Sequence, residues 1–510
     1  MLSRMPAGSG EIFDVSQERI RLMHFTWIAF FITFYVWFNM APLATTMLDD
    51  VGGEGGWLTK DHIKILAICN VALTIPARIF VGALLDRFGP RRVFSALLIV
   101  MAFPTFAFAF GNSFVQLLIA RLLLSIIGAG FVIGIRMISQ WFPPSMIGRA
   151  EGLYAGWGNF GSAWAAMTLP WIALSVFGSY DDGWRYAMAL NGSVSLIYGF
   201  IYFFAVRDVP VGTEFVGTDK VGPMTMTSRF GVAQYLVWSI PVMGALGLLA
   251  WRVSRIDVDG EPIISQGLLW LIYGGLTLVY LAHVVKTLQV NIPYLRAGVA
   301  GAEKYSFGSV AALNTTYFAN FGAELAVVSM LPAFFEGTFT VSPEKAGLVA
   351  SSFAFVNLVA RPLGGLVSDS LPNRKWVMVA YMGGIAPGFL AMSFIGSTWP
   401  LWVAIALTIM TSVFVQGAQG ATYAIIPMVS RHQTGQVAGM VGAYGNVGAV
   451  VYLVVLSLVS EQTFFLLLAG GSLFSVVFCA IFLENPEGSF DEDYGAADDE
   501  VAESQGAAAN

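Results

Sequence analysis

The sequence predicts an all-α polytopic membrane protein of two pseudo-symmetric six-helix bundles, with two inserted helices between the two halves of the chain. Composition is the first indication, because 56% of the 510 residues are hydrophobic and only 11% are charged, whereas soluble domains carry about 25% charged residues. Apolar runs of about 18 to 25 residues, long enough to cross a bilayer as helices, recur along the chain. Two motifs also occur twice at nearly the same spacing. A membrane barrel would instead show alternating polar and apolar residues.

The apolar runs predict about fourteen transmembrane helices. These cover residues 26–48, 62–84, 92–111, 114–139, 149–174, 187–206, 233–251, 266–285, 308–335, 346–367, 375–397, 400–428, 436–460 and 463–483. The predicted regions are an N-terminal cytoplasmic segment 1–25, a first bundle 26–206, a linker with the two additional helices 207–307, a second bundle 308–483 and a disordered acidic tail 484–510.

Basic residues in the short loops predict the orientation of the helices. They gather on one side of the predicted membrane, at Arg87, Arg91, Arg92, Arg149, Arg374, Lys375 and Arg431. Loops rich in Lys and Arg stay in the cytoplasm. We therefore expect a multi-pass protein of the cell membrane with both termini in the cytoplasm.

An internal duplication underlies the two bundles. The segment RIFVGALLD at 78–86 corresponds to RPLGGLVSD at 361–369, at an offset of 283 residues. The segment GRAEGLYAGWGNFG at 148–161 corresponds to GQVAGMVGAYGNVG at 435–448, at an offset of 287. Two independent matches at nearly one offset indicate two copies of a six-helix half, an arrangement common in transporters.

The loop GALLDRFGPRR at 82–92 resembles the motif between helices two and three of the major facilitator superfamily. We expect Asp86 to face loop arginines such as Arg91, or the end of a neighbouring helix. Such a contact would form a latch that breaks as the two bundles rock. The alternative is a solvated basic loop without a conformational role.

Two arginines open the repeated motif. Arg78 lies eight residues before Asp86, which places it about 12 Å into the bilayer, and Arg361 lies at the equivalent depth. An arginine there costs several kcal/mol unless it is paired or faces a cavity. Two converging guanidinium groups form a site for a small anion. The alternative is a structural role, with each arginine bonded to carbonyls or to a carboxylate.

Glu324 is the clear mid-helix carboxylate of the sequence. Tyr317 precedes it by seven residues, which is two helical turns, so both side chains share one face. Burial and a nearby arginine act in opposite directions on such a carboxyl, and this competition would couple proton release to anion binding. A static ion pair between Glu324 and one of the arginines is the alternative.

The glycine-rich segments GWGNFG at 156–161 and AYGNVG at 443–448 resemble the paired signature of the nitrate/nitrite porter family of the major facilitator superfamily. The mid-helix arginines agree with that family, and FGAELAVVSMLP at 321–332 resembles its proton-coupled branch. The inserted helices depart from the twelve-helix pattern. The resemblance implies secondary active transport of nitrate, nitrite or both by alternating access.

The family's residue roles carry over to matching positions. The resemblance implies that Arg78 and Arg361 clamp the anion and that Asn159 and Asn446 lie near it. Phe131 and Tyr317 correspond to the aromatic walls. The glycines are expected to let two helices approach their neighbours closely and slide along a moving seam. These are Gly156, Gly158, Gly161, Gly445 and Gly448.

The coupling mechanism stays open at this point. A negative-inside potential opposes nitrate entry by about 2.3 kcal/mol per 100 mV, so uptake needs proton symport or exchange for an exiting anion. Glu324 favours symport over nitrate/nitrite antiport, because exchange needs no titratable group. Two other possibilities are a major facilitator for a small organic anion and a non-transporting receptor that signals through the acidic tail.

Enzymatic functions find little support in the sequence. Cys69 and Cys479 lie in apolar runs, and no nucleophile, base or metal constellation is visible. We therefore expect no cofactor, no metal and no nucleic-acid partner. The expected partners are the nitrate or nitrite anion, protons and the lipid bilayer, and we expect a monomer to be functional.

Overall fold

The computed structural model describes most of the chain, namely residues 14–52, 56–180, 182–213, 215, 222–255, 257–258, 261–299, 304–341, 343–430 and 433–485. Three expectations lie outside the described residues: the first part of the N-terminal segment, residues 1–13; Arg431; and nearly all of the acidic tail, residues 486–510. The described chain is helical apart from loops and one short hairpin, β1 (Asp257–Val258) with β2 (Glu261–Pro262).

The described part of the first half contains nine α-helices. They are α1 (Glu18–Trp37), α2 (Ala44–Val51), α3 (Lys60–Cys69), α4 (Thr74–Phe88), α5 (Pro90–Ala109), α6 (Phe114–Leu124), α7 (Gly130–Trp141), α8 (Pro144–Trp171) and α9 (Gly183–Ala205). Two helices follow between the halves, α10 (Arg229–Val253) and α11 (Gln266–Ala297). The second half contains α12 (Phe307–Phe339), α13 (Pro343–Phe355), α14 (Asn357–Ser370), α15 (Arg374–Met392), α16 (Leu401–Val429), α17 (Thr434–Leu456) and α18 (Glu461–Phe482).

Several predicted helices are interrupted or shifted. The run 62–84 forms α3 and α4 with a break between them, and the run 114–139 forms α6 and α7 joined by a 3₁₀ segment. The two breaks lie together, since Ser125 Oγ accepts a hydrogen bond from Leu73 N at 3.0 Å. The first helix begins earlier than predicted, at Glu18 instead of residue 26. The charged residues at its start interrupt the apolar run but not the helix.

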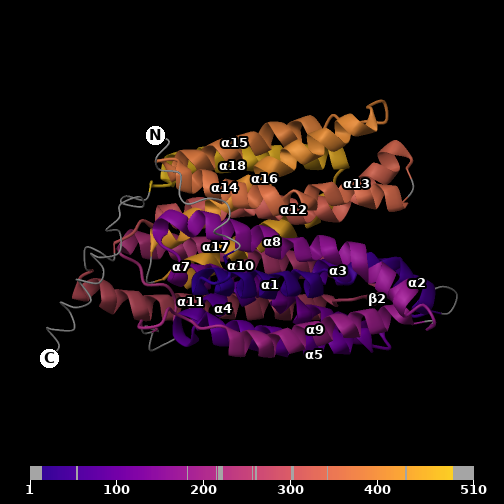
Figure 1. Ribbon diagram of the computed structural model, residues 1–510, viewed down its shortest axis with the longest axis horizontal. Helices are drawn as coiled ribbons and strands as arrows, with labels where there is room; N and C mark the ends of the chain where they lie inside the picture. Colours follow the sequence, from indigo (N-terminus) through magenta and orange to yellow (C-terminus); the bar gives the residue numbers. More distant parts are fainter. Residues whose placement is uncertain are drawn as a thin grey trace.

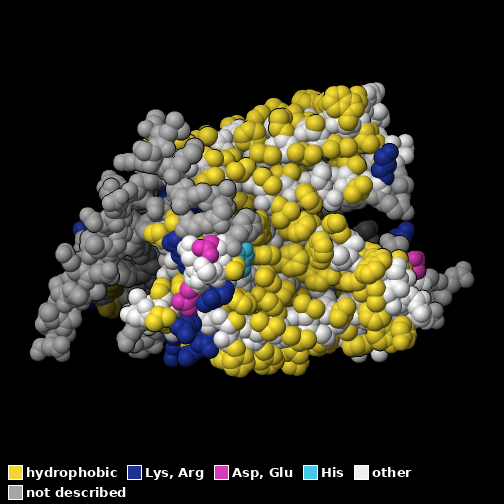
Figure 2. All heavy atoms as spheres, viewed as in Figure 1, with side chains coloured by type: hydrophobic (Ala, Val, Ile, Leu, Met, Phe, Trp, Pro, Cys, Tyr) yellow, Lys and Arg dark blue, Asp and Glu magenta, His cyan; other side chains and the backbone are white. Residues whose placement is uncertain are grey.

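The two halves lie side by side, and helices of one half pack against helices of the other (Figure 1). In each half one helix packs on a helix of its own half and on one of the other half: α8 contacts α1 and α14, while α17 contacts α12 and α4. These pairs are equivalent under the duplication. Figure 2 shows hydrophobic side chains over the middle of the visible face, with many of its basic side chains near one end of the molecule. The arrangement fits a membrane-embedded helical bundle.

The helices α10 and α11 occupy the predicted place of the inserted pair. Eleven described helices are long and apolar enough to cross a membrane, and these two are among them. Along α17, Tyr444 donates a hydrogen bond to Trp238 O of α10, and Arg252 Nε donates to Ser457 Oγ at 3.0 Å. The pair is therefore attached to the second half. That it adds two membrane crossings to twelve others stays a prediction.

Candidate functional site

Arg78 is fully buried in α4 and bonded to carbonyls of both halves. Its Nε donates to Gly128 O at 3.0 Å, and its Nη1 donates to Gly442 O at 2.6 Å. Gly442 belongs to α17 of the second half. The remaining nitrogen, Nη2, has no hydrogen-bond partner. Arg78 therefore spans the contact between the halves and keeps one terminal nitrogen available.

Arg361 of α14 makes the equivalent contact from the second half to the first. Its Nη1 donates to Ala155 O of α8 in the first half, at a longer distance of 3.4 Å. Ala155 and Gly442 are related by the same offset of 287 as the glycine motifs, so the two crossing bonds obey the pseudo-twofold symmetry. Nε and Nη2 of Arg361 have no partner. In the described part of the chain, neither Arg78 nor Arg361 forms an ion pair with a carboxylate.

An aromatic ring brings the two guanidinium groups together. The Cζ atoms of Arg78 and Arg361 lie 5.4 and 5.7 Å from the centroid of the Phe131 ring, within the range of cation–π attraction. The ring of Tyr317 runs parallel to that of Phe131, with an interplanar angle of 2° and centroids 6.0 Å apart. Both rings are buried. The two predicted aromatic residues thus meet the two predicted arginines.

Two further aromatic residues complete this cluster and were missed from the sequence. The ring of Phe321 lies 5.1 Å from Arg78 Cζ and stacks on Tyr317 at 4.8 Å. Tyr423 of α16 packs edge-on against Phe131 and Tyr317, at 4.5 and 4.9 Å, and its buried hydroxyl has no partner. Phe321 could have been found from its spacing of four residues after Tyr317. For Tyr423 the frequency of aromatic residues, 14% of the chain, hides any signal.

The two asparagines differ in how they are bonded. Asn446 Nδ2 donates to Gly442 O at 3.3 Å, the same carbonyl that binds Arg78. Both polar atoms of Asn159 are buried without a partner. Asn159 lies one helical turn after Ala155, whose carbonyl binds Arg361. Each asparagine therefore lies one helical turn after the residue whose carbonyl accepts a hydrogen bond from an arginine of the other half.

Glu324 lies near this cluster without an ion pair to either arginine. Its Oε1 accepts a hydrogen bond from Asn357 Nδ2 at 2.6 Å, and its Oε2 accepts one from Gln419 Nε2 at 2.7 Å. Asn357 precedes Arg361 by one turn of α14. The alternative of a static ion pair between Glu324 and an arginine is therefore wrong for this conformation. Both amide donors were missed from the sequence.

The predicted glycines allow close packing, but mainly within each half. A Cβ at Gly158 would overlap the Phe30 ring, and one at Gly445 would lie 2.5 Å from Tyr317 Cδ1. Gly161 and Gly448 are packed as tightly against backbone atoms of α1 and α12. The expected close approach to neighbouring helices is therefore present at these four glycines, and each pair seals α8 or α17 to a helix of its own half. Whether the helices slide there stays a prediction.

The seam between the halves lies at other glycines of the same motifs. A Cβ at Gly156 would lie 2.6 Å from Asn357 O of α14. One at Gly82 would lie 2.6 Å from Gly435 O, and one at Gly365 would overlap Gly148 O. These contacts join α8 to α14 and α4 to α17. Of the five predicted glycines, Gly156 alone has such a contact with the other half.

Asp86 contacts a helix terminus and an arginine, but not the expected one. Its carboxylate lies against the first turn of α17 at Gly435, and its Oδ1 is 3.5 Å from Arg136 Nε. Arg91 lies elsewhere, with its Nε donating to Phe203 O and its backbone N to Asp208 Oδ1, both at 2.7 Å. Of the two partners expected for Asp86, the helix end is therefore present and the loop arginine Arg91 is not, because Arg91 is held by the end of α9 and the segment after it.

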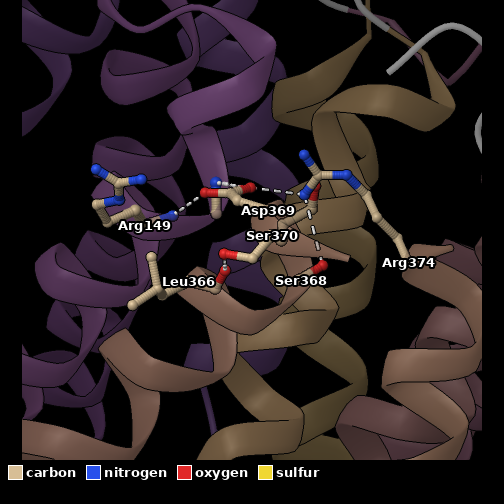
Figure 3. Close-up of polar contacts among 8 residues, drawn as sticks. Arg149, Leu366, Ser368, Asp369, Ser370 and Arg374 are labelled. Atoms are coloured by element: carbon tan, nitrogen blue, oxygen red, sulfur yellow. Dashed lines mark hydrogen bonds and ion pairs between the residues drawn. The ribbon is translucent and has the colours of Figure 1, made fainter. Parts of the chain in front are cut away.

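Asp369 forms the equivalent contact of the second half (Figure 3). It accepts hydrogen bonds from Gly148 N at 3.1 Å and Arg149 N at 2.6 Å, in the first turns of α8. Arg374 Nη1 also lies 2.8 Å from Asp369 Oδ1. Hydrogen bonds to a charged carboxylate are stronger than those between neutral groups, so these contacts hold α14 firmly to α8. We call the contacts of Asp86 and Asp369 the two latches.

The arrangement as a whole suits a small anion. Two guanidinium groups with free N–H donors face aromatic rings, with no ion-paired carboxylate to neutralise them among the described residues. The side chains of Arg78, Arg361, Phe131 and Tyr317 are all buried. The described residues hold no group of three or more His, Cys, Asp or Glu side chains able to bind a metal.

Comparisons with known proteins show the family of the chain. The chain matches the model of the Major Facilitator Superfamily over residues 26–316 and 313–505. It is 45% identical to the nitrate/nitrite transporter NrtP of Nostoc punctiforme, over 95% of this chain and 96% of that one. It is 27% identical to the high affinity nitrate transporter 2.5 of Arabidopsis thaliana, over 86% of this chain and 74% of that one.

Solved structures show the same fold at low identity. A double Trp mutant of XylE matches with a TM-score of 0.63 and 15% identity, covering 94% of this chain and 97% of that one. The human organic anion transporter MFSD10 matches with a TM-score of 0.60 and 14% identity, covering 91% and 100%. These similarities confirm the predicted all-helical fold of two related halves.

Proposed function

Since the chain belongs to the nitrate/nitrite porter family of the major facilitator superfamily, we propose that it transports nitrate, nitrite or both by alternating access. The observation that carries the proposal is the pair of buried guanidinium groups, which have three unpartnered nitrogens between them. Nitrate is planar and singly charged, and a guanidinium group offers planar paired donors. The anion would bind between Arg78 and Arg361, against Phe131 and Tyr317.

Alternating access follows from bonds that cross between the halves. Arg78 bonds to α17 and Arg361 bonds to α8, so an anion that draws both guanidinium groups inward changes both crossing contacts. The latches at Asp86 and Asp369 close one end of the seam. The basic residues near them, such as Arg149 and Arg374, suggest that this end faces the cytoplasm. We propose that opening of the latches releases the anion there.

Proton symport is the coupling that Glu324 supports best. In this conformation two amide N–H groups hold its carboxylate. The carbonyl oxygens of both amides, Asn357 Oδ1 and Gln419 Oε1, have no partner. Rotation of either amide would therefore present an acceptor to a protonated Glu324. Glu324 would therefore keep a hydrogen-bond partner in both its ionised and its protonated state. Nitrate/nitrite antiport would not require this capacity.

An organic anion is the second candidate substrate, since two arginines would bind a carboxylate equally well. The aromatic rings of Phe131, Tyr317 and Tyr423 pack against one another at centroid distances of 4.5 to 6.0 Å. A substrate larger than nitrate would have to separate these rings. We therefore favour the small inorganic anion.

Uptake by purified protein in proteoliposomes tests the proposal. Arg78→Ala and Arg361→Ala should each abolish nitrate uptake, and a matched control, Arg207→Ala, should transport normally because its side chain is 63% exposed. A pH gradient, acid outside, should drive accumulation if the mechanism is symport. Nitrate accumulation that requires internal nitrite and does not depend on the pH gradient would support antiport instead. Normal uptake by both arginine variants would contradict the site.

A further inference from the structure

Glu151 of α8 is a buried carboxyl to which neither the sequence nor the proposed mechanism assigns a role. Its side chain is fully buried, and neither carboxylate oxygen has a hydrogen-bond partner. Every other buried carboxylate described above is held by amides, helix N–H groups or an arginine. An ionised carboxylate in this setting would be desolvated without compensation. The geometry therefore requires Glu151 to be neutral, which means protonated, in this conformation.

The charged groups around Glu151 do not offer it a free cation. On α14 it faces Asp369, which carries a negative charge, and on α15 it faces Arg374, whose Nη1 already binds Asp369. On its own helix, Tyr154 lies one turn away and donates to Phe131 O at 3.0 Å. Two basic groups of other packed helices have contacts elsewhere, Arg19 of α1 with Met146 and Arg136 of α7 with Asp86. Arg149 lies two residues away on α8, but the charged groups that act on Glu151 are Asp369 and Arg374.

The position of Glu151 ties its exposure to the opening of the seam. It lies within one turn of Gly148 and Arg149, whose backbone N–H groups bind Asp369 in the latch. The next residue, Gly152, is so close to α14 that a Cβ there would lie 2.8 Å from Arg361 O. Water can reach Glu151 from this side only when α8 separates from α14. Separation would hydrate the carboxyl and favour its ionised form.

We propose that Glu151 is a second proton-binding site, which holds a proton while the α8–α14 contact is closed and releases it to the cytoplasm when that contact opens. The proposal rests on the proposed function and adds one proton to the one carried by Glu324. A second proton makes uptake electrogenic, with net positive charge entering, so that the membrane potential drives it. The duplication does not provide another copy, because the equivalent residue of α17 is Ala438.

A structural link connects Glu151 with the anion site. Tyr154 packs against Phe131 with ring centroids 6.3 Å apart and binds its carbonyl oxygen. Phe131 in turn lies against both arginines. Binding of an anion that moves Phe131 would therefore also move Tyr154 and the turn of α8 that carries Glu151. This route couples the second proton to substrate binding.

Infrared spectroscopy on the purified full chain in lipid vesicles tests the protonation directly. The wild type at neutral pH should show a protonated-carboxyl C=O band that shifts in D₂O and is absent from Glu151→Gln. The control Glu461→Gln, at an exposed helix start, should leave the band in place. Identical carboxyl bands in wild type and Glu151→Gln would overturn the proposal. Glu151→Ala, which copies the residue of the other half, gives the same comparison if the Gln variant does not fold.

Reversal potentials in proteoliposomes test the coupling. With a fixed nitrate gradient and a voltage set by potassium and valinomycin, Glu151→Gln should move one proton fewer per nitrate than the wild type. An unchanged proton-to-nitrate ratio would overturn the role in coupling. If wild-type vesicles take up no nitrate at all, the proposed function fails, whereas the infrared comparison still decides whether Glu151 holds a proton.

Discussion

The two latches occupy equivalent positions but are built with different strength. Asp369 accepts two backbone hydrogen bonds from α8 and pairs with Arg374 at 2.8 Å. Asp86 faces the backbone of Gly435 and Gln436 in the equivalent turn of α17, but these contacts are weaker than those of Asp369, and its oxygen lies 3.5 Å from its arginine. Duplication has thus preserved where the halves touch, while the side chains have diverged. The difference suggests that the α4–α17 contact opens more easily than the α8–α14 contact.

The arginines show the opposite asymmetry. Arg78 is fixed by two carbonyls, one from each half, whereas Arg361 has one long hydrogen bond and two free nitrogens. The half with the tighter latch therefore carries the less restrained arginine. We infer that Arg361 makes the larger movement when an anion binds and that Arg78 provides the fixed side of the clamp.

The largest effect is expected where the halves touch through glycine. Gly365→Ala should abolish nitrate uptake, because the added Cβ would overlap Gly148 O of the backbone and prevent closure. Gly82→Ala, at the equivalent contact, should cause a smaller loss since its Cβ would lie 2.6 Å from Gly435 O. Gly383→Ala is the control, with nothing within 4 Å. Equal uptake by all three variants would remove the case for a tight seam.

Removing the carboxylate charge should destabilise the closed end by different amounts at the two latches. Asp369→Asn should destabilise the closed end by about 1.5 to 3 kcal/mol, the usual contribution of hydrogen bonds to a charged group, which is roughly a 10- to 100-fold shift in population. Asp86→Asn should cause a smaller shift. Spin labels at the exposed and equivalent positions Phe88 and Leu371 would report the separation. A larger shift for Asp86→Asn would reverse the comparison.

A smaller difference is expected between the asparagines. Asn159→Ala should weaken nitrate binding about fivefold, since a hydrogen bond contributes about 1 kcal/mol and its amide is free to bind the anion. Asn446→Ala should weaken binding less, because its N–H group already donates to Gly442 O. Equilibrium nitrate binding to the purified variants measures both. Equal binding by wild type and Asn159→Ala would remove Asn159 from the site.

The smallest expected effect is a change in the pH dependence of stability, at the starts of α5 and α15. Asp208 Oδ1 accepts from Arg91 N at the start of α5, as Asn485 Oδ1 does from Lys375 N at the start of α15. Burial raises the pKa of the Asp208 carboxyl above 3.8, against the effect of its hydrogen bond with Arg91. The folded state then binds more protons than the unfolded state, so stability falls as pH rises through the raised pKa.

Asp208→Asn should remove this pH dependence while keeping the hydrogen-bond acceptor. Between about pH 4 and pH 7 the melting temperature of the wild type should therefore fall relative to that of the variant. Asn485→Asp is the reciprocal variant and should introduce a similar dependence in the second half. Parallel melting curves for wild type and Asp208→Asn across this range would contradict the assignment.

The fold was largely predictable because a bilayer leaves few alternatives to helices, and the duplication fixed which helices correspond. The helix breaks were not predictable, since their backbone groups are satisfied by distant partners, as Leu73 N is by Ser125. The arginines could be predicted from the cost of mid-membrane charge. Their carbonyl partners, Gly442 and Ala155, could not, because any residue can supply a backbone carbonyl.

Equilibrium nitrate binding to purified Arg78→Lys and Arg361→Lys tests the central claim most directly. Lysine keeps the positive charge but lacks the planar fork of donors. If both guanidinium groups clamp the anion, each variant should bind nitrate at least about tenfold more weakly, a loss of roughly 1.4 kcal/mol or more. Wild-type affinity in both variants would show that the anion does not bind between Arg78 and Arg361.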